Sequence, residues 1–154
     1  MTNIPHPLQR TALRVLEDWG MMLAEEVSKP EARFDASTPV LLSWVEMKGS
    51  FEGAVSILTQ EGFLRTLAAN LLGMAEGDVT PEDEKDAFRE MGNVLAGNFL
   101  TEAYGTDLAF DVTPPQVNEV SYAEFEKASN RPVSFFFVAD ELPVMVSFSI
   151  REKV

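Results

Sequence analysis

Four residues in the stretch DAFREMGNVLAG have types and spacings that suit chemistry on one helix face. They are Asp86, Glu90, Asn93 and Gly97. At about 100° per residue in an α-helix, all four lie within a sector of about 60°. The apolar residues of the same segment fall on the opposite side: Phe88, Met91, Leu95 and Phe99. The polar face is therefore predicted to point into solvent, where packing does not explain it.

An acid and an amide on a rigid helix can assist phosphoryl transfer to water. A carboxamide both donates and accepts hydrogen bonds, so Asn93 can hold a water molecule in one orientation. A carboxylate such as Glu90 can pair with a cation on a partner. Phosphoryl transfer needs mainly positioning and charge neutralisation. Such a helix would complete an active site whose phosphoryl group and metal come from another protein.

Asn93 and Gly97 also run against helix propensity. Asn is unfavourable inside a helix, and Gly is less favourable than Ala by about 1 kcal/mol. Acids on a solvent-facing helix are ordinary, so the carboxylates alone predict only a solvated face. A glycine beside an asparagine, however, lets a partner's backbone or a substrate approach closely. Gly92 differs, because the same angular step places it at the margin of the apolar stripe, where packing on a sheet explains it.

The helix that carries these residues has a clear start signal. Thr80 is a typical N-cap and Pro81 suits the first helical position. Glu82 and Asp83 complement the helix dipole in the first turn. The helix is predicted to continue to about Gly105.

The remaining pattern predicts an α+β fold in which long amphipathic helices pack on a largely antiparallel β-sheet. A first helix is expected over Leu8 to Val27, ending before Pro30, with a loop after it. Further elements follow: a hairpin of Val40 to Met47 and Phe51 to Leu58, a helix from Gln60 to Leu72 closed by Gly73, strands at Leu108 to Val112 and Val117 to Ser121, and a hairpin of Val133 to Val138 and Val144 to Ile150. No linker divides the chain, so residues 1–154 are expected to form one domain.

The run Phe135 to Val138 is apolar on both faces of its predicted strand. Such a strand is covered by helices on one side and by another element on the other, or it lies in a subunit contact. Both explanations stay open at this point.

Composition excludes several classes of function. The chain has 12 Lys plus Arg against 25 Asp plus Glu, for a net charge of −13, so a nucleic-acid backbone would be repelled. It has no cysteine, and its single histidine, His6, is expected to be a solvent-facing residue of an N-terminal tail, so no His/Cys zinc site can form. No apolar run is long enough to span a bilayer. A cytoplasmic protein without a metal of its own is expected.

The segment around Glu90 resembles the CheC and CheX chemotaxis phosphatases, which dephosphorylate the response regulator CheY. Their motif is an Asp or Ser, three residues, Glu, two residues, Asn, and some two dozen residues later a proline. Asp86, Glu90 and Asn93 match it, and Pro115 stands slightly short of the CheC spacing. Glu90 and Asn93 form the only Glu-x-x-Asn of the chain, which is the CheX-like arrangement.

That resemblance implies a role for each matched residue. Asn93 would orient the attacking water at the phosphoaspartate, and Glu90 would pair with the active-site lysine of a CheY-like receiver. Mg²⁺ would belong to the receiver, and no cofactor of the chain's own is implied. Asp86 and Gly97 are expected to contribute to binding, Gly97 because its missing side chain permits close approach. Whether Asp86 acts on the partner or only caps and solvates the helix stays open. The resemblance also implies a homodimer.

Two other functions fit the same sequence. The architecture also resembles the middle region of flagellar switch proteins, so the chain would then be a non-catalytic module that binds a receiver or a flagellar component. A small-molecule-sensing domain is the third possibility, and a deep apolar pocket remote from Glu90 would favour it.

Overall fold

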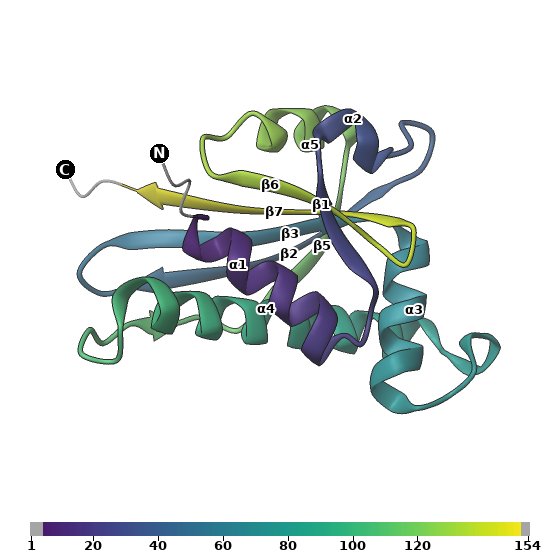
Figure 1. Ribbon diagram of the computed structural model, residues 1–154, viewed down its shortest axis with the longest axis horizontal. Coiled ribbons are helices and arrows are strands. Elements are labelled where there is room, and N and C mark those ends of the chain that lie inside the picture. Colours follow the sequence, from purple (N-terminus) through teal and green to yellow (C-terminus); the bar gives the residue numbers. More distant parts are fainter. Residues whose placement is uncertain (1–4, 152–154) are drawn as a thin grey trace.

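A seven-stranded antiparallel sheet lies between two layers of helices in the computed structural model, which describes residues 5–151 (Figure 1). The order of the strands is β1-β6-β7-β3-β2-β4, and β5 also pairs with β2. The strands are β1 (Ala24–Val27), β2 (Val40–Lys48), β3 (Glu52–Thr59), β4 (Asp111–Val112), β5 (Gln116–Val120), β6 (Ser134–Ala139) and β7 (Leu142–Arg151).

The helices divide unequally between the two faces of the sheet. α1, α3 and α4 cover one face, and the shorter α2 and α5 cover part of the other (Figure 1). Their bounds are α1 (Pro7–Arg14), continued by the π-helical turn η1 (Val15–Trp19), α2 (Lys29–Ala32), α3 (Glu61–Leu72), the 3-10 turn η2 (Glu76–Asp78), α4 (Pro81–Tyr104) and α5 (Tyr122–Ser129). None of the helices within residues 5–151 is long and apolar enough to cross a membrane.

Alternating side chains of the strands build a core on each face. On β7, Val144, Val146 and Phe148 pack toward α1 and α4, whereas Met145 packs toward α2 and α5. The predicted fold class, helices packed on an antiparallel sheet, is therefore confirmed.

The predicted start and end of the long helix are confirmed. Thr80 Oγ1 accepts from the Asp83 N–H at 3.1 Å, and Asp83 Oδ2 accepts from the Thr80 N–H at 3.0 Å, which is a reciprocal capping box. At the other end the Gly105 N–H donates to the Thr101 carbonyl at 2.9 Å. α4 therefore runs through 24 residues without a break.

Both predicted hairpins are present. β2 and β3 pair from Leu41 opposite Thr59 to Lys48 opposite Glu52, and β6 pairs with β7 across a turn at Asp140 and Glu141. The predicted helix before Gly73 is also confirmed as α3, and Gly73 closes it with a left-handed φ of 63°.

The first predicted helix was wrong beyond Trp19. The helix ends at Gly20, the chain turns at Met21 with φ 56°, and Ala24–Val27 form the edge strand β1 instead. β1 exists because it pairs with β6, Ala24 opposite Ala139 and Val27 opposite Phe136. That partner is more than a hundred residues away, so the local pattern of apolar residues did not predict the strand.

Two short helices were missed, and one strand is shorter than predicted. In the expected loop before β2, Ser28 and Glu31 cap α2. After β5, Ser121 Oγ accepts from the Glu124 N–H at 3.1 Å and begins α5. The strand predicted over Leu108 to Val112 is reduced to Asp111–Val112, paired with Lys48 and Met47 of β2.

The doubly apolar strand is covered within the chain. Phe137 is buried in the core beneath α1 and α4, and Phe136 is buried on the opposite face among residues of α2 and α5. Of the two explanations that the sequence left open, the intrachain one is confirmed. The segment thus gives no reason to expect a subunit contact.

The prediction for His6 was wrong. Its Nδ1 accepts from the Leu8 N–H at 3.0 Å, and Gln9 Oε1 accepts from the His6 N–H at 3.1 Å, so His6 is the N-cap of α1. Its ring lies 5.6 Å from that of Phe135 and 6.2 Å from that of Phe99, measured between centroids. Burial, and secondly the charge of Arg10, lower the pKa of His6.

Candidate functional site

The exposed face of α4 carries the four residues that the sequence singled out. Asp86, Glu90, Asn93 and Gly97 are all exposed, whereas Phe88, Met91, Leu95 and Phe99 are buried beneath the same helix. The polar residues are therefore brought together on one surface, as the helical spacing predicted.

Close packing on the sheet holds this helix in place. Ser43 Oγ on β2 donates to the Phe88 carbonyl at 3.2 Å. A Cβ added at Gly92 would lie 2.8 Å from Ser43 Oγ and 3.4 Å from Pro115 Cβ. Only a glycine lets α4 lie this near to β2. Pro115 thus lies near the face of the helix at Gly92, the residue that precedes Asn93.

Glu90 and Asn93 keep their side chains available. Within residues 5–151, neither side chain takes part in a hydrogen bond or an ion pair. Asp86 differs, because its Oδ1 accepts from Arg89 Nη1 at 3.0 Å. The carboxylate and the amide that could act on a partner are therefore free, while the first acid of the motif is already engaged.

Gly97 has no packing role among the described residues. Apart from its chain neighbours and the backbone of its own helix, a Cβ built there meets no atom of residues 5–151 within 4 Å. A glycine on an exposed turn of a long helix costs stability relative to alanine, and nothing in this part of the chain compensates for that cost.

A groove between α1 and α4 adjoins Asn93 and Gly97. Its volume is about 310 Å³, and it is lined by Arg14, Asn93, Val94, Gly97, Asn98, Thr101 and Glu102. Glu102 Oε2 accepts from Arg14 at 3.2 Å and Glu102 Oε1 accepts from Arg10 at 3.1 Å. Hydrogen bonds from Arg14, and then from Arg10, lower the pKa of Glu102. Arg14 and Glu102 could not be singled out from the sequence, because only the packing of α1 on α4 brings them together.

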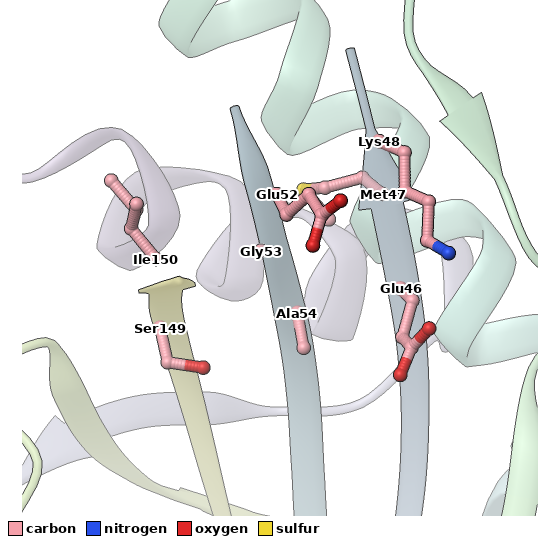
Figure 2. Close-up of a pocket in the computed structure, with 8 residues that line it drawn as sticks. All are labelled: Glu46, Met47, Lys48, Glu52, Gly53, Ala54, Ser149 and Ile150. Atoms are coloured by element: carbon pink, nitrogen blue, oxygen red, sulfur yellow. The ribbon is translucent and has the colours of Figure 1, made fainter. Parts of the chain in front are cut away.

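Two other hollows lie away from this face. One of about 270 Å³ opens at the ends of β2, β3 and β7, where Figure 2 shows Glu46 and Lys48 beside Ala54 and Ser149. These side chains project from the sheet face opposite to α4, since their neighbours Val45 and Met47 pack beneath that helix. This hollow shares no lining residue with the groove beside Asn93.

The other hollow, of about 560 Å³, lies between β5 and the start of α4. Leu41, Leu64 and Val117 line it together with Glu61 and Glu84. Its lining is more apolar than polar, but it is open to solvent and carries the carboxylates of Glu61 and Glu84, so it is not the deep apolar pocket that the small-molecule alternative needs. In the described part of the chain, no three His, Asp or Glu side chains are grouped so as to hold a metal ion.

Comparison with known proteins places this geometry in a family. The family model for the chemotaxis phosphatase CheX matches residues 41–138, which is more than half of the chain. No curated protein matches the sequence.

Solved structures share the fold. CheX from Vibrio vulnificus superposes with a TM-score of 0.70 at 15% identity, covering 94% of this chain and 97% of that one. A CheX–CheY–BeF3–Mg²⁺ complex from Borrelia burgdorferi matches with a TM-score of 0.63 at 25% identity, covering 97% and 100%. The FliM middle domain from Vibrio alginolyticus matches at 0.52 and 14%, covering 94% and 88%. Since the CheX model covers more than half of the chain, including β3 and the whole of the helix that presents Glu90 and Asn93, this chain belongs to the CheX family of chemotaxis phosphatases.

Proposed function

We propose that this protein hydrolyses the phosphoaspartate of a CheY-like response regulator. The observation that carries the proposal is that Glu90 and Asn93, matched to the family motif, stand exposed and unengaged within residues 5–151 on a helix fixed to the sheet. A rigid support matters because catalysis by positioning is lost when the acting group moves by about 1 Å.

Asn93 is the catalytic residue in this proposal. Its amide holds a water molecule through one hydrogen bond and directs an oxygen lone pair of that water at the phosphorus atom of the partner. Water attacks in line, and the bond between phosphorus and the aspartyl oxygen breaks. Inorganic phosphate is released, and the receiver keeps its free aspartate carboxylate. The chain supplies orientation only, because the phosphoryl group resides on the partner.

Glu90 is the docking residue. We expect its carboxylate to pair with the receiver lysine, which fixes the helix at the depth where Asn93 reaches the phosphoryl group. Mg²⁺ is expected to be held by the receiver, and the Borrelia burgdorferi complex, which contains CheY, BeF3 and Mg²⁺, supports that assignment. Receiver signalling would place the protein in the cytoplasm.

Asp86 and Gly97 complete the proposed contact. Asp86 holds Arg89 through the 3.0 Å ion pair at the edge of the exposed face. Gly97 has no side chain, so the backbone of the partner can approach the helix closely beside Asn93. We further propose that the protein forms a homodimer, as the family resemblance implies. Light scattering on the purified protein tests that point.

A dephosphorylation assay tests the proposed function. CheY-like receivers are phosphorylated with acetyl phosphate in Mg²⁺, the donor is removed, and loss of phosphate is followed with and without the protein. The proposal expects faster loss from at least one receiver at a substoichiometric amount of protein. The same rate with and without the protein for every receiver of the source organism would contradict it.

A second function is a binding module without catalysis. The shared fold of the FliM middle domain favours it. This alternative expects saturable binding of a BeF3-loaded receiver, or of a flagellar component, without any turnover. Turnover excludes it.

A further inference from the structure

The groove between α1 and α4 continues the exposed face that carries Asn93. Asn93 and Gly97 line the groove themselves, together with Arg14 from α1. When Asn93 enters the phosphorylated pocket of a partner, the segments of the partner beside that pocket therefore lie over this groove. Gly97 leaves space for that part of the partner, because a Cβ there would meet no described atom within 4 Å apart from its chain neighbours and its own helix backbone.

Opposite charges lie on the two sides of Asn93. Glu90 precedes it along α4 and has no ion-pair partner within residues 5–151, whereas Asp86 is already paired with Arg89; Arg14 lies on the other side, across the groove. Arg14 and Arg10 together face the single carboxylate of Glu102, so this cluster of three carries one net positive charge. A partner surface with the reverse arrangement of charges would dock in one register only.

Arg14 can exchange its ion pair with Glu102 for an ion pair with another protein. Its side chain is 47% exposed, and exposed ion pairs of this kind contribute little to stability. When Arg14 moves away, Glu102 is still paired with Arg10, so its carboxylate retains one ion pair. The guanidinium can then make a bidentate contact with a carboxylate of another protein.

From these features we infer that the groove is the second half of the receiver-docking surface, and that Arg14 contacts a carboxylate on a loop of the receiver beside its phosphorylated pocket. The inference rests on the proposed function and names a specificity-determining residue for it. Arg14 contacts neither the water nor the phosphoryl group, so it acts on binding and not on the chemical step.

Steady-state kinetics with a phosphorylated receiver that responds to the wild type test the inference. Arg14→Ala should raise KM about twofold to fivefold and Arg14→Glu about tenfold, with kcat unchanged. The difference should shrink as ionic strength rises. Arg10→Ala is the matched control, because Arg10 also pairs with Glu102 but does not line the groove, and its KM should stay within about twofold of the wild type.

Several outcomes would overturn the inference. One is an unchanged KM for Arg14→Glu. Another is an equal change of KM in Arg10→Ala and Arg14→Ala, because net charge alone would then explain the change. If the wild type accelerates no dephosphorylation, the proposed function fails on its own, and the same variants are then compared by their Kd for a BeF3-loaded receiver. A Kd for Arg14→Glu equal to that of the wild type, or no binding by either, rejects the role of the groove.

Discussion

Gly92 and Gly97 lie on the same helix but face opposite environments. A Cβ at Gly92 would come within 2.8 Å of Ser43 Oγ on the sheet, whereas a Cβ at Gly97 would meet no atom of residues 5–151 within 4 Å apart from its chain neighbours and its own helix backbone. The first glycine is explained by the fold. The second has no such explanation among the described residues, and the proposed docking of a partner supplies one.

Gly97→Ala should therefore separate stability from function. Alanine removes the conformational cost of glycine at an exposed helical position, so the free energy of unfolding should rise by about 0.5–1 kcal/mol. The added methyl group should meanwhile raise KM for the phosphorylated receiver. Chemical denaturation and steady-state kinetics on the same preparation check both effects. A variant that is more stable and fully active would remove Gly97 from the docking surface.

Gly92→Ala should have the opposite effect on stability. The new Cβ must displace Ser43 Oγ or lift the helix, which should destabilise the protein by about 1–3 kcal/mol. In the double variant Gly92→Ala with Ser43→Ala the nearest obstacle is gone, so the loss should be smaller than the sum of the two single losses. Urea denaturation of all four proteins gives the coupling energy, and strict additivity would contradict the proposed contact.

Glu90→Gln tests the proposed pairing with the receiver lysine. The substitution keeps the shape of the side chain and removes its charge, so kcat/KM should fall about 10- to 100-fold, with the fold intact because the residue is exposed. Glu82→Gln is the matched control, as Glu82 is exposed on the first turn of the same helix, and it should retain wild-type activity. Equal activities of the two variants would mean that the charge at Glu90 plays no part in docking.

His6 should make stability depend on pH. Its pKa is lower in the folded protein than the ordinary value of about 6.5, because burial, and secondly the charge of Arg10, disfavour the charged ring. The unfolded chain therefore binds the proton more readily. The contribution of His6 is complete above pH 6.5 and is lost as the pH falls through the folded pKa.

His6→Asn provides the control for that effect, since asparagine also caps a helix but does not titrate. The denaturation midpoint of the wild type should fall more than that of the variant between about pH 7.5 and 5.5. Parallel curves over this range would show that the neutral ring of His6 does not stabilise the first helix.

The sequence predicted those features that short-range chemistry determines. Thr80, Pro81 and Asp83 mark the start of α4, and the helical period then sets Glu90 and Asn93 on the side opposite to Phe88. Gly73 marks the end of α3 in the same way. Because the site lies on one uninterrupted helix, its geometry could be predicted without knowledge of the tertiary structure.

Features that depend on distant pairing could not be predicted. Ala24–Val27 form a strand only because β6 lies beside them, and the groove at Arg14 exists only because α1 packs on α4. The His6 cap was missed for another reason: histidine is an uncommon N-cap, and its ring is held in place by Phe135 and Phe99 from distant elements. The Ser28 and Glu31 box of α2 was, by contrast, readable in the sequence.

The most direct test of the central claim is kcat for dephosphorylation of a responsive receiver by Asn93→Ala. Loss of the group that orients the water should lower kcat by about 10² to 10³. Thermal unfolding should show a fold at least as stable as the wild type, because alanine is the better helix former at this exposed position. A variant that folds normally and keeps the wild-type kcat would contradict the account.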